Sequence, residues 1–177
     1  MALLLVGPPL EVGQPLITRL VAQGDEVRVL EDDSERAAVW RDLGAHVALG
    51  EWEEDLVERA AQDVRTIVLF DSRPGIEPWL LEQLVTGARL ARVERVIWCA
   101  PAHRREDTAV LDRSGLEYMV LVTGGTKGLL KRSRAVDLGA LALAIDAADD
   151  TAGEFHAVLD LTKDESWRTL GLEPPGK

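Results

Sequence analysis

Short apolar runs alternate with longer, more polar segments along the first two thirds of the chain. The runs are rich in Val, Leu and Ile and are too short for helices, which is typical of strands buried on both faces of a parallel sheet. They occupy residues 2–6, 26–30, 46–49, 66–70, 95–99 and 118–122. The segments between them have the length of helices and occupy residues 14–22, 34–43, 54–62, 77–91 and 106–113. This alternation predicts a parallel sheet with helices on both faces.

The last third of the chain departs from this alternation. Residues 123–134 contain Gly and Lys and are predicted to form a loop, whereas the Ala-rich residues 136–148 are predicted to form a helix. A last strand is expected at residues 154–161, and residues 173–177 are expected to be a frayed tail. Ser34 is a candidate N-cap for the helix that follows the second strand.

Successive parallel strands joined by helices form right-handed crossovers, which leaves few possible topologies. We therefore predict a doubly wound α/β sheet in the order 3-2-1-4-5-6, as in dinucleotide-binding domains. At 177 residues the chain has the size of a single domain, spanning residues 1–177. In such sheets ligands bind beyond the carboxyl ends of the strands, so the loops after residues 6, 30, 49, 70, 99 and 122 form the candidate site.

Composition excludes several kinds of partner. The formal net charge of −11 opposes binding to nucleic acid or to an anionic membrane surface. The first apolar run is shorter than the core of a signal peptide and lacks a positive flank. Cys99 is the only cysteine, so no intramolecular disulfide forms, and no Cys or His spacing indicates a metal site. These features predict a cytoplasmic protein.

Several short segments resemble, in order and spacing, those of one known family. They are LLVG at 4–7 with Gly13, GDEVRVL at 24–30 followed by SERA at 34–37, LGA at 43–45, GE at 50–51, RVIW at 95–98, SGLEY at 114–118, VTGG at 122–125, AVDL at 135–138 and AGEFH at 152–156. Together they resemble the atypical short-chain dehydrogenase/reductases with an NAD(P)H-binding, NmrA-like domain. This resemblance implies a Rossmann fold and a dinucleotide site. Its degenerate residues would be Gly7, Leu10, Val12, Gly13, Asp32, Glu51, Asp71 and Ser72.

The phosphate-binding turn departs from the family pattern. Where the family has three glycines at the spacing GxxGxxG, residues 7–13 read GPPLEVG, with Leu10 in the middle position. A leucine side chain would occupy space that the pyrophosphate needs, and Pro8 and Pro9 lack N–H groups that could bind phosphate. Pro15 is expected only near a helix start, so the first helix is predicted to begin late and to point its N-terminus away from the ligand.

Acidic residues follow the second and third strands. Glu31, Asp32 and Asp33 stand where the family often supplies a basic group for the 2′-phosphate, and Glu51 with residues 53–55 adds negative charge. We therefore expect no cofactor, with NAD(H) favoured over NADP(H) if one binds, because an acidic residue can accept hydrogen bonds from ribose hydroxyls. The alternative for residues 53–55 is a solvated helix start that complements the helix dipole.

Catalytic signals of related reductases are missing. Those enzymes use a tyrosine with a lysine four residues later, but Tyr118 is followed at that spacing by Val122 and lies in a predicted strand. The segment after the fifth strand, residues 100–105, is short. Ser114 has no GxSxG context and is better explained as a helix cap. We therefore predict no catalytic residues and no metal ligands.

Other features near the predicted strand ends have two interpretations each. His103, Arg104 and Arg105, and the basic residues within 127–134, either bind a phosphate or carboxylate or form a solvated loop, and the same choice applies to residues 71–73. Three tryptophans either pack in the core or line a flat apolar pocket or an oligomer interface. They are Trp52, Trp79 and Trp98.

These observations lead to three hypotheses. The first is a Rossmann-fold protein that has lost normal dinucleotide binding and catalysis and acts as a binding module for a small anionic or apolar ligand, or for a protein partner. The second is an NAD(P)H-dependent reductase or isomerase with an unusual cofactor loop, because hydride transfer depends mainly on positioning cofactor and substrate. The third is a structural subunit that forms a homo-oligomer through its outer helices.

Overall fold

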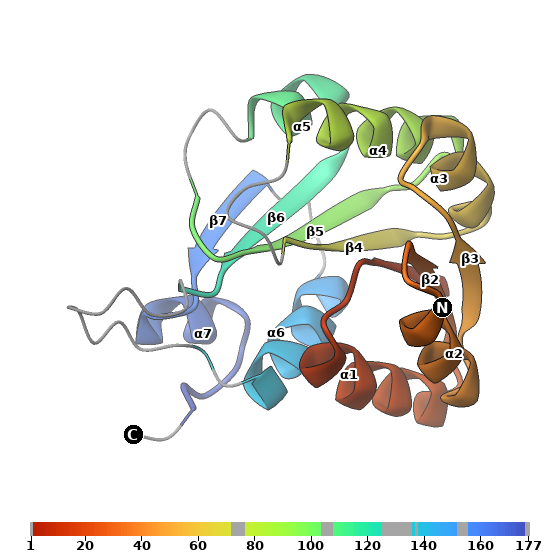
Figure 1. Ribbon diagram of the computed structural model, residues 1–177. Coiled ribbons are helices and arrows are strands. Elements are labelled where there is room, and N and C mark those ends of the chain that lie inside the picture. Colours follow the sequence, from red (N-terminus) through yellow and green to blue (C-terminus); the bar gives the residue numbers. More distant parts are fainter. Residues whose placement is uncertain are drawn as a thin grey trace, which may run out of the picture.

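The computed structural model describes residues 2–71, 77–103, 108–124, 136, 138–151 and 156–175. A seven-stranded sheet, parallel throughout, runs through the centre of the molecule in the order β3-β2-β1-β4-β5-β6-β7 (Figure 1). The strands are β1 (Ala2–Val6), β2 (Glu26–Glu31), β3 (His46–Leu49), β4 (Thr66–Phe70), β5 (Arg95–Ala100), β6 (Glu117–Val122) and β7 (His156–Asp160). The helices are α1 (Leu10–Gln23), α2 (Ser34–Asp42), α3 (Glu54–Ala60), α4 (Pro78–Leu90), α5 (Ala109–Ser114), α6 (Leu138–Asp150) and α7 (Asp164–Thr169).

The strands are apolar along their length because each face of the sheet has its own core. Alternate side chains such as Leu3 and Leu5 pack beneath α1, α2, α6 and α7, whereas Leu4 and Val6 pack beneath α3, α4 and α5. Figure 1 shows these two helical layers on opposite sides of the sheet. The predicted doubly wound fold and the order of the first six strands are therefore confirmed, and β7 extends the sheet beside β6. No helix among the described residues has the length and apolarity that a membrane span requires.

The predicted late start of the first helix is wrong. Helix α1 begins at Leu10, directly after the turn, and its first turn is closed by hydrogen bonds from the N–H groups of Val12 and Gly13 to the carbonyl of Pro9, at 3.1 and 2.8 Å. Pro15 lies inside the helix on its exposed side. Its missing hydrogen bond leaves the carbonyl of Glu11 facing solvent, so the proline is tolerated where a purely local rule excludes it.

The prediction for the C-terminal segment lacked one element. A short helix, α7, follows β7, and its Trp167 is buried and donates from Nε1 to the carbonyl of Leu161 at 2.7 Å. The predicted strand at 154–161 is observed as His156–Asp160, and residues 154 and 155 lie outside the described residues. Of the predicted tail, residues 176 and 177 also lie outside them.

Candidate functional site

The carboxyl ends of the strands form one continuous rim. Backbone hydrogen bonds continue one residue past the strands, from Gly7 N to Leu30 O at 3.1 Å, from Gly50 N to Glu31 O at 2.9 Å and from Asp71 N to Cys99 O at 2.9 Å. Around this rim lie the predicted cofactor-binding residues that the structure describes: Gly7, Leu10, Val12, Gly13, Asp32, Glu51 and Asp71. Ser72, also predicted, lies outside the described residues. That these residues bind a cofactor stays a prediction at this point.

The two retained glycines of the turn are required by geometry. Gly7 has a φ of +59°, and a Cβ there would stand 2.8 Å from a ring carbon of Trp52, which reaches over from the loop after β3. A Cβ on Gly13 would stand 2.6 Å from the ring of Trp40 on α2. The turn is therefore held between two indole rings, and neither glycine tolerates a side chain without movement of its neighbours.

Leu10 occupies a different environment from the core residues around it. It is the first residue of α1 and is 37% exposed, whereas Val12 is buried. No side chain caps this helix start, and the N-cap residue is Pro9 in an extended conformation. The first N–H groups of a helix have no partner within the helix, and together with the dipole they attract anions. No capping side chain therefore satisfies the N–H groups at this end of the helix, beside Leu10.

Glu31, the last residue of β2 and the first of the acidic segment, is fully buried. Its Oε1 accepts hydrogen bonds from the N–H groups of Asp32 and Asp33, at 3.0 and 3.2 Å. The same oxygen accepts from Nη2 of Arg36 at 2.8 Å, and Oε2 accepts from Nε1 of Trp40 at 3.1 Å. Both oxygens are thus occupied by donors of the chain itself, so Glu31 anchors the end of β2 to α2.

Asp33 is also occupied, and it replaces Ser34 as the observed N-cap of α2. Its Oδ1 accepts from the N–H groups of Glu35 and Arg36, at 2.8 and 3.1 Å. These hydrogen bonds hold the pKa of Asp33 below its usual value, with that of Arg36 the larger cause. Asp32 is exposed, and its carboxylate lies 3.3 Å from Nη2 of Arg36. Each of the three acids therefore has a partner within the chain.

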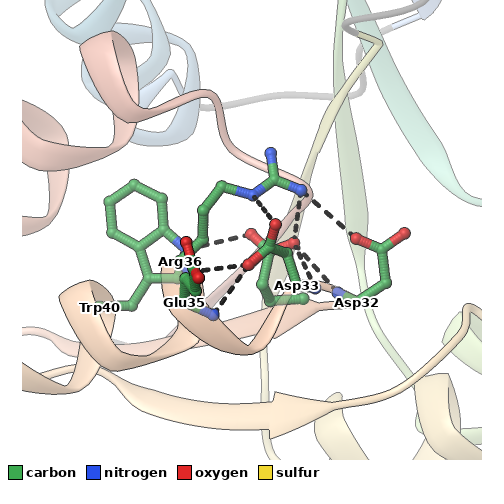
Figure 2. Close-up of polar contacts among 6 residues, drawn as sticks. Asp32, Asp33, Glu35, Arg36 and Trp40 are labelled. Carbon is green, nitrogen blue, oxygen red and sulfur yellow. Dashed lines mark hydrogen bonds and ion pairs between the residues drawn. The ribbon is translucent and has the colours of Figure 1, made fainter.

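Arg36 brings a cation to this segment. Figure 2 shows its side chain beside Asp32 and Asp33, with the guanidinium directed toward their carboxylates. Its Nε is buried and makes no hydrogen bond, since the nearest Asp33 oxygen is 4.0 Å away. Arg36 and Trp40 were missed in the sequence, although their spacing of four residues places both on one face of α2, toward the end of β2.

The acidic residues after β3 serve mainly the start of α3. Glu54 and Asp55 lie in its first turn, as the solvated helix-start interpretation requires, and the N–H of Glu54 donates to Oε1 of Gln83 on α4 at 3.1 Å. Glu51 is exposed on the rim.

Three side chains of types that often take part in catalysis, a tyrosine, a serine and a cysteine, are engaged or buried within the fold. Tyr118 lies near the amino end of β6, where its hydroxyl donates to Asp112 at 2.5 Å and its ring contacts His156. Burial is the main cause of its raised pKa. Ser114 caps α5, accepting from the N–H of Leu116 at 3.0 Å. Cys99 is buried, and burial raises the pKa of its thiol far above the usual range.

The end of β5 differs, because two polar atoms there lack partners. Nε1 of Trp98 and Nε2 of His103 are buried and make no hydrogen bond. Trp98 itself is a core residue, 3% exposed, whereas Trp79 at the start of α4 is 57% exposed. The remaining predicted basic residues here, Arg73, Arg104, Arg105, Lys127, Lys131, Arg132 and Arg134, lie outside the described residues.

Sequence searches found no matching family model and no matching curated protein. Solved structures do match. An NADPH-dependent quinone oxidoreductase of Escherichia coli in complex with NADPH has a TM-score of 0.74 at 17% identity, covering 97% of this chain and 76% of the other. The triphenylmethane reductase of Citrobacter sp. complexed with NADP(H) has a TM-score of 0.68 at 17% identity, covering 97% and 75%. A protein described as an NAD-dependent epimerase/dehydratase from Bacillus halodurans has a TM-score of 0.69 at 17% identity, covering 89% and 92%.

The expectation of no cofactor, with NAD(H) ahead of NADP(H), is contradicted by these structures, since two of the three hold NADP(H) or NADPH. The physical reason lies in the acidic segment. Two of its three carboxylates are occupied by donors of the chain itself, so the segment is less repulsive toward a 2′-phosphate than its sequence implies. The fold is the Rossmann fold of NAD(P)-dependent reductases and epimerases, which confirms at the level of the fold the resemblance to the atypical short-chain dehydrogenase/reductases.

Proposed function

We propose that this protein is an NADP(H)-dependent reductase that binds its nucleotide across the carboxyl ends of β1 and β2. The observation that carries the proposal is Arg36. Its guanidinium is held at the end of β2 by the buried Glu31 at 2.8 Å, and its Nε has no hydrogen bond. A 2′-phosphate would complete that donor set, because a guanidinium presents a planar fork that matches phosphate oxygens.

The start of α1 would hold the pyrophosphate. It follows Gly7, Pro8 and Pro9 directly, carries no side-chain cap and directs the positive end of the dipole toward the rim. Three residues of the turn do not fit: Pro8 and Pro9 offer no N–H, and the side chain of Leu10 stands where a glycine would leave bare backbone. Its 37% exposure leaves it free to turn toward solvent, so it is expected to weaken nucleotide binding without preventing it.

Negative charge beside the proposed 2′-phosphate site is the main factor that opposes phosphate binding there. Asp32 lies 3.3 Å from Arg36 and would compete with a phosphate for the same donor. The competition favours the phosphate on two grounds: it carries up to two charges, and Asp32 is exposed and solvates readily. This is the reason to expect a modest preference for NADPH over NADH.

Bound NADPH would supply a hydride at its nicotinamide ring. The residues of this chain would orient the ring and exclude water, with the partly buried Trp52 over the turn and the exposed Trp79 at the rim after β4. The quinone after which one similar enzyme is named is a flat conjugated molecule. We extend this class to the present protein, because exposed indole rings stack on flat acceptors.

Calorimetric titration with NADPH, NADP+, NADH and NAD+ tests the proposal. We expect NADPH to bind, and Arg36→Gln to weaken that binding about ten- to a hundredfold while leaving NADH binding unchanged. Arg36→Lys should keep part of the preference. Arg41→Gln, at the exposed end of the same helix, is the matched control and should change neither affinity.

Two outcomes would contradict the proposal. One is the absence of NADPH binding by the unaltered protein. The other is an NADPH to NADH preference that Arg36→Gln leaves unchanged while thermal denaturation shows the variant to be folded. Reduction of menadione by NADPH, followed at the absorbance of the reduced nicotinamide, tests the reductase activity separately from binding.

A further inference from the structure

His103 lies just beyond the carboxyl end of β5, on the rim described above. Its Nε2 is buried and has no hydrogen-bond partner, although the residue as a whole is partly exposed. Leaving a buried polar atom unpaired costs about 1–3 kcal/mol, and native structures keep few such atoms. The position therefore suits an imidazole whose Nε2 gains a hydrogen-bond partner when a molecule binds at the rim.

Trp98, a residue of β5 itself, supports this interpretation. The indole N–H of Trp98 is also buried without a partner, although Trp98 is 3% exposed and belongs to the core. Within the described part of the chain, the buried side-chain polar atoms without partners belong to Arg36, Trp98 and His103. Arg36 serves the proposed nucleotide site at β2, which leaves the end of β5 as the second place where polar groups are unsatisfied.

The described residues offer few other proton donors near this end of β5. The hydroxyl of Thr123 donates to the carbonyl of Ala100 at 3.2 Å, and the Cys99 thiol is buried with a raised pKa. Tyr118 lies toward the opposite end of the sheet, bonded to Asp112. An imidazole can both hold and release a proton near neutral pH, which the other candidates do not do readily.

We propose that His103 contacts the substrate at this rim and donates a proton to its carbonyl oxygen, the substrate being a flat conjugated carbonyl compound. This role rests on the proposed reductase function. The hydride from NADPH forms a new bond to a carbon of the conjugated system, and the displaced electron pair moves to the carbonyl oxygen. That oxygen takes the proton from Nε2 of His103. NADPH leaves as NADP+, the substrate gains two electrons, and the neutral imidazole regains a proton from water.

Nuclear magnetic resonance gives a readout that does not need turnover. The chain has three histidines, so a long-range 1H–15N spectrum contains three imidazoles. Menadione added together with NADP+ provides a conjugated carbonyl without a hydride source. We expect the Nε2 resonance of His103 to shift, whereas His46 and His156, both exposed and at the first positions of β3 and β7, should not. An unchanged His103 resonance at saturating menadione would overturn the proposal.

Kinetics separate proton donation from a structural role. With menadione and NADPH, His103→Ala should lower kcat about a hundredfold or more, leave the KM for NADPH unchanged and regain activity when imidazole is added. His103→Gln, which keeps a hydrogen-bond donor, should retain substrate affinity but not kcat. The matched control is His156→Ala.

The outcomes also distinguish the two proposals. Full activity of His103→Ala overturns the role of His103 and leaves the reductase function standing. A lack of NADPH binding by the unaltered protein overturns the function, and with it the role that depends on it. A low kcat without imidazole rescue, together with a lowered melting temperature, would assign His103 a structural role instead.

Discussion

The two ends of the sheet differ in the buried side-chain nitrogens that lack a hydrogen-bond partner. At the amino ends of β4, β5 and β6, the buried Arg95, Thr66 and Asp149 all have partners inside the protein. At the carboxyl ends, the buried Nε of Arg36, Nε1 of Trp98 and Nε2 of His103 have none. An unsatisfied buried group costs stability. Under the proposals above, a bound ligand would supply the missing partners at the carboxyl ends, whereas the fold itself supplies them at the amino ends.

Arg95 organises the amino end. It is 2% exposed, and its Nη1 donates to the carbonyls of Ala148, Asp149 and Thr151 at 3.0 to 3.2 Å, where helix α6 ends. Its Nη2 donates to Glu117 on β6 at 2.8 Å. A cation at a helix C-terminus also complements the dipole, so one side chain joins β5, β6 and α6.

The largest expected effect is on stability and comes from removing the guanidinium of Arg95. Arg95→Met should cost about 3–5 kcal/mol, because it leaves the last carbonyls of α6 and the Glu117 carboxylate without their donor. Arg19→Met is the matched control: it removes a 2.7 Å ion pair to Asp146 on the same helix, but Arg19 is exposed and Asp146 only partly buried, so the pair should contribute less than about 1 kcal/mol. Urea denaturation measures both. Equal losses in the two variants would refute the special role of the amino end.

The second effect tests the packing beneath the phosphate-binding turn. Alanine normally stabilises a helix relative to glycine by about 0.5–1 kcal/mol, but at Gly13 its Cβ would stand 2.6 Å from Trp40. Overpacking costs about 1–3 kcal/mol, so Gly13→Ala should be destabilising and should also weaken NADPH binding by displacing the start of α1. Gly24→Ala is the control, because its φ of +88° is strained but nothing lies within 4 Å. It should lower the melting temperature and leave nucleotide affinity unchanged.

The sequence predicts the positions and order of the strands better than it predicts the site, and it gave no indication of the contacts of Arg95. Each strand is an uninterrupted apolar run, and right-handed crossovers allow few orders, so the positions of six strands followed directly. The start of α1 did not, because a local rule about Pro15 ignores that the ring faces solvent. The acidic residues were misjudged for a related reason: the burial of Glu31 and its four donors arise only when β2 and α2 come together. Likewise, α7 has only six residues, and it is stabilised by the burial of one of them, Trp167, against the rest of the protein.

The third prediction concerns Leu10, which stands where a regular dinucleotide-binding turn has its middle glycine. Leu10→Gly should tighten NADPH binding up to about tenfold, because it clears the approach to the start of α1, and should cost about 1 kcal/mol of stability through helix propensity. Leu143→Gly, at an exposed position of α6, provides the same propensity change away from the site. Calorimetry and thermal denaturation together give both quantities. Unchanged or weaker NADPH binding in Leu10→Gly would show that the leucine is not the obstacle.

The smallest expected effect concerns Asp149, whose buried carboxylate is predicted to reduce the stability of the fold. Burial is the main cause of the raised pKa of Asp149, against the opposing hydrogen bond from Thr66 at 2.5 Å. A carboxyl whose pKa is raised in the folded state destabilises the fold above that pKa, and this cost is relieved as the pH falls through it, because the folded protein then binds a proton more tightly than the unfolded chain. Asp149→Asn removes the titrating group but keeps an oxygen that can accept from Thr66. From neutral pH downward, the unaltered protein should therefore gain stability relative to Asp149→Asn, by less than the effects above, as measured by urea denaturation at a series of pH values. A difference between the two proteins that does not vary with pH would mean that Arg95 and Thr66 fully compensate the buried charge.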